Sequence, residues 1–278
     1  MLETDCSKAD TQATATPISP SPSPGSSQSL AIPTIEDYFA AVATRTPQPA
    51  LIEQILPKQP GEYIIIAGRT GIGKTVFTFQ TAFCLATPQP LLNKYVCRKS
   101  KVAYIALEGD DHNFMDRYSK VNPQFPTRQG NLHFELLQKD IPAKLLHGIE
   151  TKIHGFGFDV AIFDGSRYLV AGDYCSPRDC RDFVSKLMQI LAKNNVVGIL
   201  TLQIKKPNRN SLAVPGDIYS IKGATEIADD ATTAILLEHT PHIKSKDAVT
   251  LYFAKHRMAT QELTPIPMML DRTVCLFK

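Results

Sequence analysis

The sequence lacks several features, and each absence removes a class of protein. No window approaches the roughly eighteen consecutive apolar residues of a membrane-spanning helix. The N-terminus carries Glu3, Asp5 and Asp10 without an apolar run, so we expect no secretory signal. The six cysteines lack the C-x-x-C spacing of a zinc site, which favours reduced thiols in a cytoplasmic protein without a membrane partner. A metal or redox role remains open for Cys175 and Cys180, which lie close in sequence.

The bulk composition is that of a globular protein. Of the 278 residues, 43% are hydrophobic and 21% are charged, which is enough for one large α/β domain, with or without a small appendage. The net charge of +3 is too small to indicate a nucleic-acid partner by itself, although it permits one.

The first 33 residues differ from the rest of the chain. Serine and proline alternate over 16–27, and no apolar set is available for burial, so we expect 1–33 to be a disordered tail. Thr34 is a candidate cap for a short amphipathic helix that would either cover the domain or dock on a neighbouring subunit. We therefore assign 34–278 to one folded domain with a short N-terminal helical extension.

Short apolar runs alternate with helical patterns after Gly61. The runs predict buried strands at 63–67, 102–107, 160–164, 196–203, 232–237 and 249–254. Helical periodicity is evident at 74–86 and 178–193. Strands that are apolar on both faces and separated by helices predict an α/β fold, in which helices flank a mostly parallel, twisted sheet.

A glycine-rich segment joins the first of these strands to the first helix. Its G-x-x-x-x-G-K-T pattern is typical of a phosphate-binding loop, in which backbone amides and the helix N-terminus surround the phosphates of ATP. We expect Lys74 to reach the β- and γ-phosphates and Thr75 to bind Mg²⁺. The alternative is a chance match in an ordinary strand–turn–helix. The loop comprises Gly68, Arg69, Thr70, Gly71, Ile72, Gly73, Lys74 and Thr75.

Two carboxylates end predicted strands. Asp164 follows four apolar residues and is expected to hold Mg²⁺ through its water shell. Glu108 follows the strand at 102–107 and is a candidate to orient the attacking water. The next two carboxylates, Asp110 and Asp111, are better explained as caps of a following helix.

From about Leu51 onward, these elements in this order resemble the RecA-like ATPases, most closely the DnaB-type and RepA-type hexameric helicases. The resemblance implies a RecA-like P-loop NTPase core in which Glu108 is the catalytic glutamate. It also places Gln203, at the end of the strand at 196–203, as the residue that senses the γ-phosphate and informs a DNA-binding loop. The segment 221–231 resembles the helicase segment that leads into the next strand.

The strand at 249–254 continues into a Lys-x-Arg pattern. In DnaB-type rings such residues project into the neighbouring subunit's nucleotide site, so the resemblance implies a homo-oligomer, a hexameric ring, with Arg257 acting in trans. Lys255 and Arg257 lie two apart on a strand and face the same way. A solvated strand end is the alternative. The family's folded N-terminal domain has no counterpart here, and 258–261 replaces the usual Asn-Gly turn.

The resemblance also places DNA in two loops. The second, about 204–222, is basic and carries Lys205, Lys206, Arg209 and Lys222, which suit a single-stranded phosphate backbone. In the first loop, about 165–176, Arg167 and Tyr168 would add a phosphate contact and a stacking surface. We therefore expect an ATP-driven single-stranded DNA translocase or helicase in replication or mobile-element maintenance, with a possible protein partner there. The alternative is a regulatory or assembly ATPase whose nucleotide state controls a protein partner.

Overall fold

The computed structural model of the chain describes residues 32, 34–44, 48–126, 130–137, 140–205, 214–223, 225–258 and 263–278. The chain divides into two compact units, Met1–Thr46 and Pro47–Lys278. In the first, helix α1 (Ile35–Ala43) follows Thr34, whose hydroxyl oxygen accepts a hydrogen bond from the Asp37 amide. This N-cap confirms the predicted helix. The predicted tail, apart from Ile32, lies outside the described residues.

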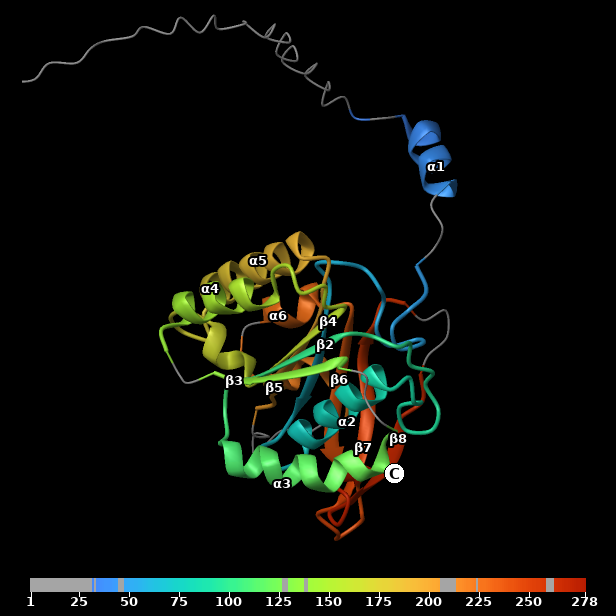
Figure 1. Cartoon of the computed structure of the whole chain (residues 1–278), viewed down its shortest axis with the longest axis vertical. Coiled ribbons are helices and arrows are strands. Elements are labelled where there is room, and N and C mark those ends of the chain that lie inside the picture. Colours follow the sequence, from blue (N-terminus) through green and yellow to red (C-terminus); the bar gives the residue numbers. More distant parts are fainter. Residues whose placement is uncertain are drawn as a thin grey trace, which may run out of the picture. The chain divides into compact units, whose positions relative to one another are not determined.

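The second unit is built on one sheet with the strand order β3-β2-β4-β5-β1-β6-β7-β8-β9 (Figure 1). The first six strands of that order pair in parallel, and the last three join in antiparallel. The predicted α/β fold with a mostly parallel sheet is therefore confirmed. The six strands that the sequence predicts are β1 (Tyr63–Gly68), β2 (Val102–Ala106), β4 (Val160–Asp164), β5 (Val197–Gln203), β6 (Thr233–His239) and β7 (Ala248–His256).

Helices cover both faces of the sheet. Helices α2 (Lys74–Ala86) and α3 (Asp111–Val121) lie on one face, and α4 (Pro142–Ile153), α5 (Pro177–Lys193) and α6 (Thr225–Asp230) lie on the other (Figure 1). Alternation along β1 serves both layers: Ile64 packs in the core with Phe77 of α2, and Ile65 packs in the core with Phe183 of α5. Each such side chain contributes about 1.5–3 kcal/mol by leaving water.

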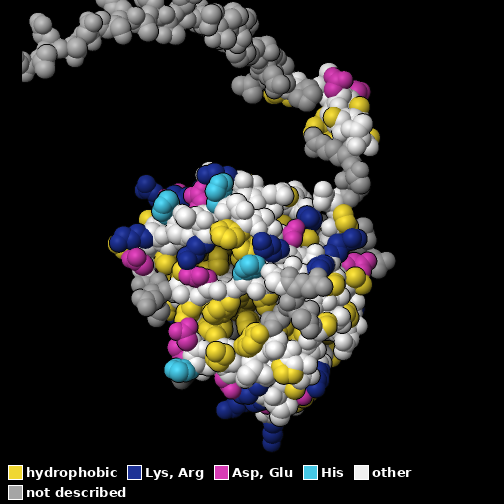
Figure 2. All heavy atoms as spheres, in the orientation of Figure 1, with side chains coloured by type: hydrophobic (Ala, Val, Ile, Leu, Met, Phe, Trp, Pro, Cys, Tyr) yellow, Lys and Arg dark blue, Asp and Glu magenta, His cyan; other side chains and the backbone are white. Residues whose placement is uncertain are grey.

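The elements that the strand and helix predictions omitted are mainly polar or short. Strand β3 (Leu132–Leu136) alternates polar and apolar residues at the sheet edge, so it gives no continuous apolar run. Helix α3 buries only Phe114 and Val121. Strands β8 (Ile266–Asp271) and β9 (Leu276–Phe277) complete the far edge. In Figure 2 hydrophobic side chains gather around the β3 edge, beneath the charged surface of α4 and α5.

The strand register brings distant segments to one end of the sheet. Gly68 at the end of β1 pairs with Gln203 at the end of β5, and Ala106 of β2 pairs with Asp164 of β4. The carboxyl ends of parallel strands lie on the same side of the sheet, so the phosphate loop and the predicted acidic residues lie close together there. These carboxyl ends form the candidate functional site.

Candidate nucleotide-binding and hydrolysis site

The predicted phosphate loop lies between β1 and the first turn of α2. Gly73 immediately precedes the helix with a φ of 101°, a left-handed conformation that glycine adopts without strain. A Cβ there would also come within 2.7 Å of the Phe277 ring. Ile72 is buried and anchors the loop, whereas Thr70 and Gly71 are exposed. The loop thus presents its outer residues and the positive end of α2 to a ligand, an arrangement suited to phosphate.

Lys74 folds back onto this loop. Its Nζ atom donates hydrogen bonds to the carbonyl oxygens of Gly68, at 2.9 Å, and Arg69, at 3.0 Å. Burial lowers the pKa of Lys74, while the nearby carboxylates of Asp164 and Glu108 act in the opposite direction by attracting the ammonium group. Phosphate oxygens make stronger hydrogen bonds with an ammonium than neutral carbonyls do. The Lys74 ammonium group therefore lies beside the position where phosphates would bind.

Asp164 is the centre of a buried hydrogen-bond network. It is 1% exposed, and its two oxygens accept hydrogen bonds from the Tyr104 hydroxyl at 2.8 Å and the Thr201 hydroxyl at 2.9 Å. Thr201 in turn accepts from the Gly165 amide at 2.7 Å. The Tyr104 hydroxyl also lies 3.1 Å from that of Thr78 on α2. The network links the predicted Mg²⁺ strand to both neighbouring strands and to the helix that follows the phosphate loop.

Tyr104 and Thr201 were not among the predicted site residues. Each is a polar residue in an otherwise apolar, buried strand, and that was the only sequence signal for them. Burial, together with the Asp164 carboxylate, raises the pKa of Tyr104 well above its ordinary value, so this hydroxyl remains a donor at neutral pH.

The residues near the loop suit a magnesium ion. Asp164 and Thr75 offer oxygen atoms, and each carboxylate oxygen retains acceptor capacity beyond its one protein hydrogen bond. Among the described residues, no group of three or more His, Cys, Asp or Glu side chains forms a metal site. One carboxylate with one hydroxyl is a donor set typical of Mg²⁺ that is shared with nucleotide phosphates.

Glu108 lies beside the loop that follows β4. A Cβ on Gly165 would lie only 3.1 Å from the Glu108 Cγ, so the two segments are in close contact. The next turn, η2 (Ser166–Leu169), carries Arg167, whose Nη2 atom lies 3.6 Å from a Glu108 carboxylate oxygen. The Arg167 guanidinium also stacks on the Tyr168 ring, 4.5 Å from its centre. Arg167, which the sequence analysis gave to DNA, therefore lies at the predicted catalytic glutamate.

Gln203 connects the site with the predicted DNA-binding loop. Together with Lys74 and Glu108 it lines a small recess at the end of the sheet. Its carbonyl oxygen accepts a 2.6 Å hydrogen bond from the amide of Lys222, at the far end of the loop. The Lys205 amide makes a matching 2.6 Å bond to the carbonyl of Ser220, so the loop is closed at its base. The remaining predicted DNA-binding residues, Lys206 and Arg209, lie outside the described residues.

Lys255 and Arg257 contact the end of α6. The Lys255 Nζ atom donates to the carbonyl oxygens of Ala228, at 2.9 Å, and of Asp229, and the Arg257 Nη2 atom donates to the Asp229 oxygen at 2.5 Å. Cations are favoured at a helix C-terminus, where carbonyl groups lack intrahelical partners. Burial and the neighbouring Arg257 lower the pKa of Lys255. The two side chains face the same way, as their spacing predicts.

The position of this pair matters as much as its contacts. Because β7 is antiparallel to β6, its carboxyl end lies at the start of β6, where His256 pairs with Thr233. The phosphate loop is at the other end, where Gly68 pairs with Leu237. Among the described residues that line the nucleotide cavity, neither Lys255 nor Arg257 is present. Lys255 and Arg257 therefore lie at the opposite end of the strands from the phosphate loop of their own chain, too far round to contact a phosphate bound there.

The cavity around the phosphate loop has a volume of about 880 Å³. One wall comes from α3, with Arg117 and Lys120, and another from the turn between β8 and β9, with Arg272 and Cys275. Two hydrogen bonds between Gln80 of α2 and the backbone of Phe277 hold β9 in place, at 2.9 and 3.0 Å. The sequence did not predict these walls, because they come from a polar helix and from the turn that follows β8.

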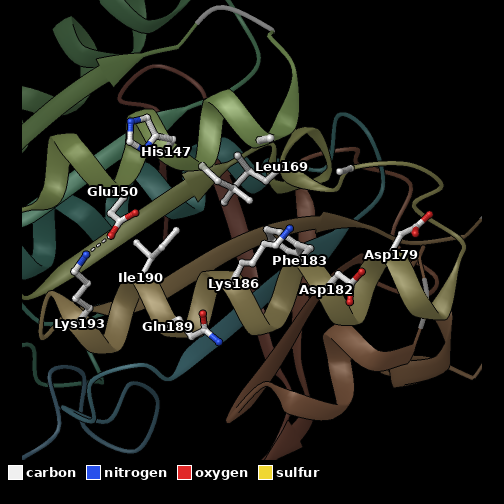
Figure 3. A pocket seen from close by; sticks show the side chains of 13 residues that line it. His147, Glu150, Leu169, Asp179, Asp182, Phe183, Lys186, Gln189, Ile190 and Lys193 are labelled. Atoms are coloured by element: carbon white, nitrogen blue, oxygen red, sulfur yellow. Dashed lines mark hydrogen bonds and ion pairs between the residues drawn. The ribbon is translucent and has the colours of Figure 1, made fainter.

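A second groove, of about 520 Å³, runs between α4 and α5 (Figure 3). Its floor is apolar, with Leu169, Phe183 and Ile190, and its rim carries charges of both signs. Glu150 and Lys193 form an ion pair across it at 2.7 Å. It contains none of the predicted site residues, so the cavity at the phosphate loop is the candidate site.

Comparisons with known proteins agree with this geometry. The family described as AAA domain matches residues 27–209. Among solved structures, a KaiC-like protein from the hyperthermophilic archaeon Pyrococcus horikoshii OT3 is similar in fold, with a TM-score of 0.55 and 17% sequence identity. The match covers 82% of this chain and 94% of that one. The search of curated proteins gave no match.

The described helices include none that is long and apolar enough to cross a membrane. The family match spans the phosphate loop, both candidate acidic residues and Gln203, and it ends before Lys255 and Arg257. The chain is therefore a member of the AAA domain family, a P-loop ATPase with the RecA-like fold.

Proposed function

We propose that the chain is an ATP-hydrolysing motor that assembles as a ring and moves along single-stranded DNA in replication or mobile-element maintenance. The observation that carries this proposal is the double position of Gln203. Gln203 lines the phosphate recess together with Lys74 and Glu108. Its backbone carbonyl also accepts a hydrogen bond from the amide of Lys222, at the end of the basic loop. A change at the γ-phosphate would therefore reach the loop through a single residue.

Nucleotide binding begins with the phosphate loop. The backbone amides and the N-terminus of α2 surround the β- and γ-phosphates, and Lys74 exchanges its bonds to Gly68 and Arg69 for phosphate oxygens. Thr75 and Asp164 would hold Mg²⁺, which would neutralise phosphate charge when bound. Tyr104 and Thr201 keep the Asp164 carboxylate in one orientation throughout.

Hydrolysis needs a group that orients the attacking water. Glu108 lines the cavity beside the phosphate loop, so its carboxylate is the candidate. Arg167 holds that carboxylate through the 3.6 Å ion pair, from a turn whose two ends are buried. We assign Arg167 as a positioning residue for Glu108, a role that DNA-strand contact would not require.

The second half of the site would come from a neighbouring subunit. Lys255 and Arg257 lie at the opposite end of the strands from the phosphate loop of their own chain. They can therefore reach a phosphate only when it is bound to a second copy. A head-to-tail arrangement of copies joins opposite faces of the molecule and closes into a ring. An arginine supplied in this way neutralises charge on the transferred phosphoryl group.

The DNA-binding part of the proposal is tested by the rate of ATP hydrolysis with and without single-stranded DNA at low salt. We expect the rate to rise with DNA, together with a ring-sized particle in a mass measurement. The control is duplex DNA of the same length. A rate that single-stranded DNA leaves unchanged would remove the translocase assignment.

The regulatory alternative has one observation in its favour. The apolar side chains Ile35, Tyr38 and Phe39 of α1 are not buried within the first unit. An exposed amphipathic helix is a common element for binding a protein partner. ATP hydrolysis that responds to a protein but not to DNA would favour this second function.

A further inference from the structure

Strand β3 (Leu132–Leu136) forms an outer edge of the sheet. It pairs in parallel with β2, and none of the other described strands pairs with its outer side. The backbone groups on that side therefore point outward without a strand partner. Proteins usually cover or disrupt such an edge, because a second strand can add to it.

Exposed aromatic side chains accompany this edge on both faces of the sheet. Phe134 is 42% exposed and packs on Tyr104 and Phe114 on the α3 side. On the α4 side, Phe156 is 55% exposed and stacks on Phe158. Figure 2 shows the resulting apolar area around β3, in contrast with the charged helices beside it. An apolar patch that coincides with an open strand edge is typical of a protein interface.

The sequence of β3 indicates what covers it. The five residues Leu-His-Phe-Glu-Leu have the same pattern in both directions, apart from the exchange of His133 and Glu135. In an antiparallel pair centred on Phe134, His133 of one copy faces Glu135 of the other, twice. The leucines at the two ends also face each other. Shifting the register loses these matches, so the strand is complementary to itself in one alignment.

We propose that β3 is a self-association surface, on which the β3 strand of a second copy of this chain adds antiparallel about a two-fold axis through Phe134. Lys152 already holds one carboxylate oxygen of Glu135 at 2.8 Å, which leaves the other oxygen for His133 of the second copy. The sheets of the two copies become one continuous sheet, and the exposed aromatic side chains are covered.

This contact is separate from the proposed ring contact. Strand β3 lies at one end of the strand order, and β7, which carries Lys255, lies beyond β6 in the other half of the sheet. The β3 contact is isologous, whereas a ring contact is head-to-tail. Self-association through β3 therefore needs neither nucleotide nor Arg257, and it stands whether or not the chain is a translocase.

The first experiment measures the mass of the full chain against concentration, without nucleotide, by analytical ultracentrifugation. We expect a dimer. His133→Glu places like charges opposite each other at two points, so the dimer dissociation constant should rise about tenfold or more. Adding Glu135→His again places a histidine opposite each glutamate, which removes the repulsion between carboxylates and should restore the dimer. Lys152→Gln, which removes only the partner of Glu135 within the chain, is the matched control and should leave the dimer intact.

The second experiment tests the register directly. In a pair centred on residue 134, the two Cα atoms lie about 4.5 or 5.5 Å apart, a separation that a disulfide spans. Phe134→Cys, in a chain whose Cys6 and Cys175 are replaced by serine, should form a covalent dimer with oxidised glutathione. Met115→Cys, on the exposed surface of α3, is the control and should not.

Three results would overturn the inference. The first is a chain that stays monomeric at tens of micromolar without nucleotide. The second is a His133→Glu variant that still associates. The third is a double variant, His133→Glu with Glu135→His, that stays monomeric although its unfolding temperature equals that of the original chain. The charge-exchange variant keeps Phe134, so the conclusion does not depend on whether Phe134→Cys folds.

Discussion

At the scale of single residues, the site depends on a carboxylate whose orientation is fixed by neighbours. Asp164 is buried and accepts one hydrogen bond on each oxygen, from Tyr104 and Thr201. A buried carboxylate that loses a donor pays a desolvation penalty as well as the bond, because water does not replace the donor. Tyr104 should therefore matter for stability and for metal use together.

We predict that Tyr104→Phe lowers the free energy of unfolding by about 1–3 kcal/mol, because one Asp164 oxygen loses its donor. Urea denaturation measures this. The same variant should need more Mg²⁺ for half-maximal ATP hydrolysis, since the carboxylate is no longer held in place. Tyr219→Phe, at an exposed tyrosine, is the control and should change stability by less than about 0.5 kcal/mol. Equal stability of the two variants would contradict the network's role.

Arg167 is tested by a double-mutant cycle with Glu108. Glu108→Gln should lower kcat by about 10²–10⁴-fold, as loss of a general base does. Arg167→Ala should lower kcat by about tenfold with little change in KM, because it positions the carboxylate rather than holding the nucleotide. In the Glu108→Gln background it should have almost no further effect.

The conservative change Arg167→Lys should recover part of the rate, and Arg178→Ala, an exposed arginine at the start of α5, is the control of equal charge. Additive losses in the cycle would mean that Arg167 acts elsewhere. A full rate in Glu108→Gln would instead reject the role of the glutamate itself.

At the scale of elements, the loop between β5 and α6 is closed at its base. Backbone bonds join Lys205 to Ser220 and Gln203 to Lys222, so the two ends of the loop lie together beside the phosphate recess. Helix α6 follows this loop, and Lys255 and Arg257 donate hydrogen bonds to carbonyl oxygens at its C-terminus. One short helix thus lies between the basic loop and the pair that is proposed to reach the next subunit.

We predict that neutralising Lys205, Lys206 and Arg209 together weakens the salt dependence of single-stranded DNA binding. Each phosphate contact contributes about 0.7 to the slope of log K against log salt concentration, so three lost contacts reduce it by about 2. Fluorescence anisotropy at several salt concentrations measures the slope. Neutralising Arg178, Lys186 and Lys193 of α5 is the control. A slope that changes only in the control would place the DNA on α5.

At the scale of the whole molecule, the sheet separates the two halves of the proposed site. The phosphate loop lies at the carboxyl end of β1, and Arg257 lies beyond the carboxyl end of the antiparallel β7, at the other edge. A monomer is therefore expected to bind ATP and to hydrolyse it poorly.

We predict that Arg257→Ala leaves ATP affinity nearly unchanged and lowers turnover by about 10³-fold or more, the effect of losing an arginine that acts in trans. Lys74→Ala should abolish turnover by removing phosphate contacts. Mixing the two inactive proteins should restore activity, because some interfaces join an intact phosphate loop to an intact arginine. Thermal unfolding of Arg257→Ala is the necessary control, since Arg257 also bonds to α6. Mixtures that stay inactive at every ratio would contradict the in-trans assignment.

The sequence alone determined the parts of this protein whose signal is local. The phosphate loop, the strands of the central sheet and the Thr34 cap each depend on neighbouring residues, through glycine spacing, continuous apolar runs or a hydrogen bond three residues away. The sequence does not predict strand β3 or the walls of the nucleotide cavity, because an exposed edge strand and a polar helix contain no continuous apolar run.

Tertiary structure decided which of these local features meet. Only the parallel register places Gln203 beside Gly68, and only packing between β2, β4 and β5 brings Tyr104 and Thr201 onto Asp164. Arg167 reaches Glu108 because Gly165 lets two loops approach closely, a contact between residues 59 positions apart in the chain. Such contacts follow from how strands pair across long sequence separations, and a local pattern of residues does not encode that pairing.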